Sequence, residues 1–150
     1  MEKIVEIIRI KQEVLEVQEK YEFLKDVQIK SPSTLIDAIR QLIGDEDREV
    51  LLVLCLNTKN KIIAVHRCHV GSINASIVHP REVFKSAILN NAATIVMAHN
   101  HPSFDPEPSN EDIQVTKRIV EAGSILGIEL LDHIIVGNEE GISLKQKGYM

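Results

Sequence analysis

The chain has 150 residues, a net charge of −5 and an apolar fraction of 44%. This length suits one domain with a sizeable core, and Ile, Leu and Val must fill that core because Trp is absent and aromatic residues are scarce. No apolar run approaches a membrane span, and no secretory signal is visible. Cys55 and Cys68 are too few for a disulfide framework. We therefore expect a cytoplasmic chain without a membrane partner.

Residues 1–30 form an N-terminal extension in which Ile, Val, Glu and Lys alternate. This pattern does not separate a strand from an amphipathic helix. Its apolar faces could pair two chains, so a homo-oligomer is one expectation. Residues 31–150 should form the folded domain. Its first element is a helix that starts at Ser31-Pro32-Ser33 and ends at Gly44, because Pro favours the first turn and Gly the end of a helix.

The remainder of the domain alternates between strand and helix patterns. We expect strands at about 49–57 and 61–70, a short strand near 76–78, a helix from Pro80, a buried strand at 93–98, a helix over 109–125, and strands at 128–136 and 142–144. Such alternation favours a three-layer α/β or α+β arrangement.

Two histidines follow the buried strand at 93–98. His99 and His101 leave its end on the same face, since side chains of an extended chain repeat every second residue. Pro102 then ends the strand, because it has no N–H to donate. Either histidine alone would be an ordinary polar residue at a strand end. Together they indicate a ligand pair.

A carboxylate joins them from the next helix. Ser109 and Asp112 have the spacing of a capping box that opens a helix. A capping box needs no metal, so helix capping is the simpler interpretation of these two residues alone. Two histidines and one carboxylate are nonetheless a ligand set that zinc uses when one position stays open for water. The sequence therefore predicts one zinc per chain, bound by His99, His101 and Asp112.

These residues resemble a known family. The pattern His99-x-His101-x7-Ser109-x-x-Asp112 is similar to the motif of the JAMM (JAB/MPN) metalloproteases, and His-Asn-His-Pro-Ser resembles its RadC branch. That motif usually has Ser or Thr where this chain has Asn100. The resemblance covers about residues 31–150. It implies a JAB/MPN-like mixed sheet flanked by helices, in a three-layer arrangement like that of cytidine deaminases.

The resemblance also implies an activity. JAMM proteins use zinc to cleave peptide or isopeptide bonds, so the implied partner is a protein or peptide substrate. Their glutamate opens an apolar strand upstream of the motif, which corresponds here to Glu49 before the run 50–56. Glu49 would accept a proton from water, and Ser109 could hydrogen-bond the water or the developing oxyanion. Without the resemblance, Glu49 is simply an exposed residue where a strand begins.

A second function competes with hydrolysis. RadC proteins are traditionally labelled DNA repair proteins, so the domain could be a non-catalytic, nucleic-acid-associated module whose metal site is structural or vestigial. DNA binding relies on Lys and Arg that neutralise phosphates, and this chain is acidic. A nuclease is not supported, because the string His-Asn-His is here contiguous. A deaminase is not supported, because the Pro-Cys-x-x-Cys half of its zinc motif is missing.

Other polar residues have simpler roles. His66 and Cys68 share a strand face but are too few to hold a metal. Glu82 rivals Glu49 as a catalytic carboxylate, although its place in the first turn of a helix explains it equally well. His133 could orient a metal ligand, but a structural pair with Asp132 is the simpler interpretation.

Overall fold

The structure, a computed structural model, describes residues 4–8, 12 and 19–150. Residues 4–8 and 12 belong to neither a helix nor a strand, and the rest of the extension before Glu19 lies outside the described residues. No described helix is long and apolar enough to cross a membrane. The elements in chain order are the 3-10 helix η1 (Glu19–Leu24), α1 (Pro32–Ile43), β1 (Val50–Leu56), β2 (Ile62–Val70), α2 (Pro80–Leu89), β3 (Thr94–Asn100), α3 (Asn110–Leu126), β4 (Glu129–Val136) and β5 (Gly141–Ser143).

The strands form one mixed sheet in the order β2-β1-β3-β4-β5. β3 and β4 run parallel, whereas the other neighbouring pairs run antiparallel. The parallel pair is joined through α3, as expected for parallel strands, which cannot be linked by a tight hairpin. This arrangement confirms the predicted mixed sheet of a JAB/MPN-like fold.

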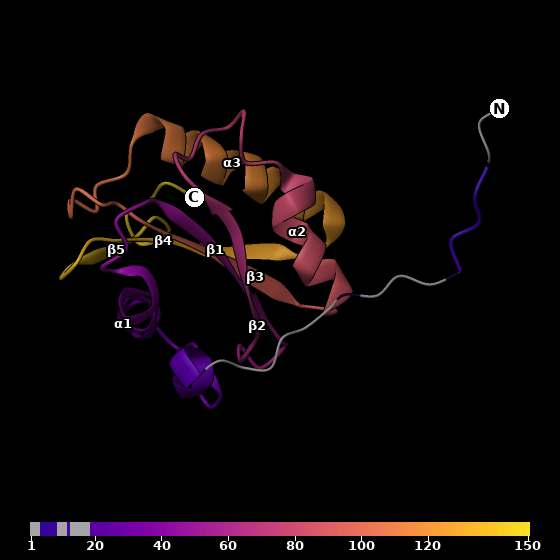
Figure 1. Cartoon of the computed structure of the whole chain (residues 1–150), viewed down its shortest axis with the longest axis horizontal. Coiled ribbons are helices and arrows are strands. Elements are labelled where there is room, and N and C mark those ends of the chain that lie inside the picture. The colour runs from indigo at the N-terminus through magenta and orange to yellow at the C-terminus, as the bar shows by residue number, and fades with distance from the viewer. Residues whose placement is uncertain (1–3, 9–11, 13–18) are drawn as a thin grey trace.

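Helices cover both faces of the sheet and make three layers (Figure 1). α1 lies on one face, and α2 and α3 lie on the other. Every residue of β1 is buried, because its side chains alternate between the two cores. Leu52, Leu54 and Leu56 belong to the core beneath α1, while Leu51, Val53 and Cys55 belong to the core beneath α2 and α3.

The prediction of a short strand near 76–78 was wrong, since residues 75–77 form a turn. Asn74 Oδ1 accepts hydrogen bonds from the backbone N–H groups of Ser76 at 3.0 Å and Ile77 at 3.1 Å. An Asn side chain that satisfies the following backbone in this way favours a turn over a strand ladder.

The sheet brings distant segments to the end of β3. Antiparallel pairing places Leu51 of β1 opposite His99, so the chain that enters β1 lies beside the end of β3. Parallel pairing places His133 of β4 opposite Met97. The loop after β3 then leads into the N-terminus of α3. Residues from β3, from β4, from the segment that enters β1 and from the start of α3 can therefore meet at this end of the sheet.

Candidate metal centre

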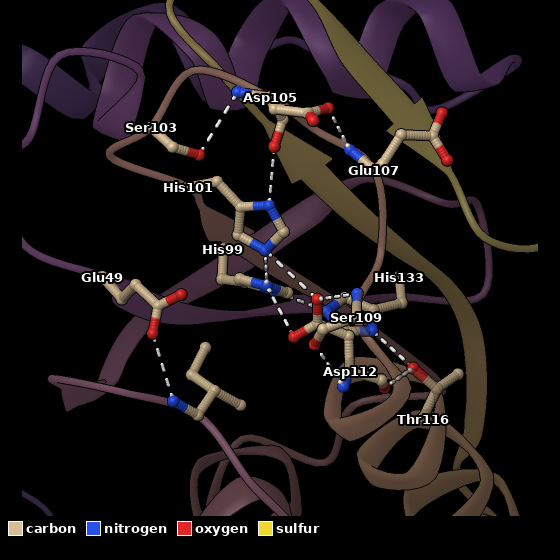
Figure 2. Close-up of polar contacts among 11 residues, drawn as sticks. Glu49, His99, His101, Ser103, Asp105, Glu107, Ser109, Asp112, Thr116 and His133 are labelled. Atoms are coloured by element: carbon tan, nitrogen blue, oxygen red, sulfur yellow. Dashed lines mark hydrogen bonds and ion pairs between the residues drawn. The ribbon is translucent and has the colours of Figure 1, made fainter.

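His99, His101 and Asp112 converge at the end of β3 (Figure 2). The Nε2 atoms of His99 and His101 lie 3.1 Å apart. Asp112 Oδ1 lies 3.2 Å from His99 Nε2, and Asp112 Oδ2 lies 3.1 Å from His101 Nε2. Within residues 4–8, 12 and 19–150, these three side chains form a group whose candidate ligand atoms all lie within 4.8 Å of one another. The predicted ligand set is thus brought together.

The start of α3 fixes the carboxylate. Ser109 is the N-cap, and its Oγ accepts a hydrogen bond from the Asp112 backbone N–H at 3.1 Å. The Ser109 backbone N–H donates in return to Asp112 Oδ2 at 2.8 Å. The capping box predicted from sequence is therefore present, and it does not compete with the ligand role. It orients the Asp112 carboxylate toward both histidines.

The contacts among His99, His101 and Asp112 favour a negative charge on Asp112 and a positive charge beside it. Burial raises the pKa of the Asp112 carboxyl, but its contacts with His101 and His99 and the Ser109 N–H lower it by more, so the net pKa is well below the usual range. Burial lowers the pKa of His101, yet its bonds to Asp112 and to the Asp105 backbone outweigh burial and leave the pKa raised. Asp112 is therefore ionised at neutral pH, as a metal ligand must be.

The loop after β3 sets which nitrogen of His101 faces this cluster. His101 Nδ1 lies 2.8 Å from the carbonyl oxygen of Asp105. A carbonyl only accepts hydrogen bonds, so Nδ1 must carry the hydrogen, and a neutral ring then has a lone pair on Nε2. That lone pair points at the Asp112 carboxylate. Acceptor atoms this close repel one another unless a proton or a cation lies between them, so the donor set fits a metal ion.

Glu49 lines the same cleft as His101. It immediately precedes β1, is half-buried, and accepts a hydrogen bond through Oε2 from the Ile73 backbone N–H at 3.2 Å (Figure 2). A cleft of about 560 Å³ is lined by Asp47, Arg48, Glu49, Gly71, Ser72, His101, Pro102, Ser103 and Ser109. The cleft therefore brings Glu49 and Ser109 together with the metal-ligand candidate His101.

Comparisons with known proteins agree with this geometry. The model of the family described as RadC-like JAB domain matches residues 29–149. This chain belongs to the RadC family of the JAB/MPN superfamily.

Similar relatives include several proteins named UPF0758 protein. One from Caldanaerobacter subterraneus subsp. tengcongensis is 54% identical over 121 residues, which cover 81% of this chain and 52% of the relative. One from Clostridium beijerinckii is 50% identical over 123 residues, covering 82% and 54%. One from Methanosarcina barkeri is 48% identical over 120 residues, covering 80% and 52%. The chain thus spans about half the length of the curated relatives it matches.

The structure explains Asn100, the departure from the JAMM pattern. Its side chain is buried beside the segment that precedes β1. Asn100 Oδ1 accepts from the Val50 backbone N–H at 2.7 Å, and Nδ2 donates to the carbonyls of Arg48 at 2.9 Å and Glu46 at 3.3 Å. In this RadC-like JAB domain, Asn100 holds the backbone on both sides of Glu49. Sequence reasoning noticed the residue but not this contact, which depends on the pairing of β1 with β3.

His133 contacts a metal-ligand candidate instead of pairing with Asp132. His133 Nε2 lies 2.8 Å from His99 Nδ1, and His133 Nδ1 lies 2.6 Å from Thr116 Oγ1. Burial lowers the pKa of His133 well below its ordinary value. Asp132 bonds instead to the His133 backbone N–H and the Ser143 hydroxyl. The expected side-chain pair is therefore absent, and no sequence pattern indicated Thr116.

The remaining candidates in the RadC-like JAB domain lie elsewhere. Glu82 is exposed and forms an ion pair of 2.9 Å with Lys85, which lowers the pKa of its carboxyl. It does not line the cleft. His66 and Cys68 lie on β2, outside the group that could hold a metal. Burial lowers the pKa of His66 and raises the pKa of Cys68, so neither side chain favours its charged form.

Proposed function

We propose that this RadC-like JAB domain is a zinc metallopeptidase that cleaves a peptide or isopeptide bond, with one zinc per chain held by His99, His101 and Asp112. The observation that carries the proposal is that His101, one of three converging ligand candidates, lines the same cleft as the carboxylate of Glu49. A metal site that serves only the fold is usually closed by four protein ligands. Three protein ligands beside a cleft support a site that stays open to water and substrate.

Zinc, when bound, supplies Lewis acidity toward water and toward the carbonyl group of an amide. Glu49 accepts the proton of the attacking water and returns it to the amine that leaves. Its bond to the Ile73 N–H holds Oε2, which leaves Oε1 for this proton transfer. A carboxylate positioned for general acid–base catalysis contributes about 10²- to 10⁴-fold in rate.

Ser109 stabilises the charge that develops on the carbonyl oxygen. Its Oγ accepts the Asp112 N–H, and its own O–H is free in direction because a hydroxyl hydrogen rotates. Ser109 is exposed and lines the cleft, so this O–H can donate to a bound substrate. One such donor to an oxyanion is worth about 3 kcal/mol.

The experiment compares Glu49→Gln with wild type. The variant should retain about one zinc per chain by elemental analysis, because Gln leaves the proposed ligand set intact, and should lose hydrolysis of peptide and isopeptide substrates. Glu82→Gln is the matched control, since Glu82 is exposed and lies outside the cleft, and it should retain activity. A fully active Glu49→Gln enzyme would exclude Glu49 as the proton acceptor.

A further inference from the structure

Four groups form a continuous chain of hydrogen bonds that begins at His99 and ends at Asp112, both of them metal-ligand candidates. It runs from His99 Nδ1 to His133 Nε2, from His133 Nδ1 to Thr116 Oγ1, and from Thr116 Oγ1 to the backbone carbonyl oxygen of Asp112 (Figure 2). Its members come from β3, β4 and α3. His99, His133 and Thr116 are fully buried, and Asp112 is nearly so. His133 and Thr116 belong neither to the proposed ligand set nor to the proposed proton transfer.

The direction of each hydrogen bond follows from its last acceptor. The Asp112 carbonyl can only accept, so the Thr116 hydroxyl, 2.8 Å away, must donate its single hydrogen there. Thr116 Oγ1 then has only lone pairs to offer to His133, so His133 Nδ1 must donate to it. Because His133 is buried without a carboxylate bonded to its ring, the neutral ring is favoured. Its Nε2 is then an acceptor.

The same logic reaches the metal site. His133 Nε2 accepts, so His99 Nδ1, 2.8 Å away, donates to it. His99 therefore carries its ring hydrogen on Nδ1 and presents a lone pair on Nε2, the atom that faces Asp112. The two histidines reach the same tautomer by different routes, because His101 donates directly to the Asp105 carbonyl.

We propose that Thr116 and His133 are positioning residues that hold His99 in its Nδ1–H tautomer, ready to ligate a divalent metal through Nε2. The proposal rests on the metal site of the proposed function. The carbonyl that directs the chain belongs to Asp112, the third ligand candidate. This chain of hydrogen bonds therefore makes the tautomer of His99 on β3 depend on the position of α3. Groups that orient metal-bound histidines in this way typically change metal affinity 10- to 100-fold when they are removed.

Thr116→Val tests this chain of hydrogen bonds, because it removes the hydroxyl with little change in side-chain volume. Without the hydroxyl, His133 loses the acceptor for Nδ1–H and can place its hydrogen on Nε2, which points at His99. His99 would then carry its own hydrogen on Nε2 and would have to move it before it could ligate. We expect Zn²⁺ affinity, measured by competition with a chelator, to fall about 10- to 100-fold. Thr116→Ser, which keeps the hydroxyl, should bind Zn²⁺ nearly as wild type does.

Thr94→Val is the matched control for the substitution itself. Thr94 lies at the start of β3, and its buried Oγ1 has no hydrogen-bond partner among the described residues, so its loss should leave Zn²⁺ affinity unchanged. Equal affinities for Thr116→Val and Thr116→Ser would overturn the proposal. So would a loss of affinity in Thr94→Val as large as that in Thr116→Val.

The tautomer is measured directly on the metal-free wild-type chain. Long-range ¹H–¹⁵N spectra of imidazole-labelled protein, at a pH well above the ordinary histidine pKa, distinguish a protonated ring nitrogen from a bare one. We expect hydrogen on Nδ1 of both His99 and His133. Hydrogen on Nε2 of His99 would overturn the proposal even if Thr116→Val failed to fold. A wild-type chain that binds no Zn²⁺ but shows the expected tautomers would refute the metal site and leave the hydrogen-bond chain established.

Discussion

Asn100→Ala should test how the backbone around Glu49 is held. Asn100 lies between the two histidine ligand candidates, but its amide bonds to Val50, Arg48 and Glu46 rather than to either of them. The substitution therefore removes a support of the proposed catalytic carboxylate and leaves the candidate ligands in place. We expect the variant to be less stable and less active, while zinc content stays near that of wild type.

The size of the effect follows from the three bonds. The Val50 N–H would be left buried without its acceptor, which costs about 1–3 kcal/mol. The two carbonyls lose one donor each, and such bonds contribute about 0.5–1.5 kcal/mol. The bond of 3.3 Å to Glu46 is the longest and should contribute least. Together these changes give about 3 kcal/mol, and for a domain of this size 1 kcal/mol corresponds to about 2–4 °C in Tm.

Urea unfolding of the metal-free chain measures this loss. Asn57→Ala is the control, because Asn57 Oδ1 accepts two backbone N–H bonds, from Lys59 at 2.9 Å and Lys61 at 3.0 Å, in an exposed turn. Water replaces exposed bonds, so Asn57→Ala should cost less than Asn100→Ala even though both variants lose backbone bonds. Ordinary surface substitutions change the free energy of unfolding by no more than about 0.5 kcal/mol. If the free energy of unfolding of Asn100→Ala lies within that range of the wild-type value, the buried amide does not hold this segment.

Two further predictions concern the ligand candidates. A Cβ at Gly137 would overlap the backbone of Phe104 in the loop that follows His101, so Gly137→Ala should lower both thermal stability and Zn²⁺ affinity; an unchanged affinity would show that the loop can shift without disturbing His101. The pKa of Asp112 is lower in the folded chain than in the unfolded one, so its stabilising contribution is complete above about pH 4 and is lost progressively as the pH falls below that value. Asp112→Asn should therefore reduce the acid-induced loss of stability in metal-free urea titrations, and an identical pH profile would contradict this.

The sequence determined the parts of this domain that depend on neighbours in the chain. The end of β3 and the start of α3 are separated by a short loop, so the two-residue period of a strand and the capping box were enough to predict His99, His101 and Asp112 together. The helix over residues 109–125 was predicted for the same reason and is present as α3 with Ser109 as its N-cap. Local rules failed at 76–78, where the Asn74 side chain favours a turn.

Tertiary structure alone decided which distant residues join the site. Glu49 was predicted only through the family resemblance, since nothing local places it near the histidines. The antiparallel pairing of β1 with β3 does so, together with the amide of Asn100. The parallel pairing of β4 with β3 brings His133 to His99, and the packing of α3 adds Thr116. Strand register depends on which apolar faces the two helical layers bury, and so it is a property of the whole sheet.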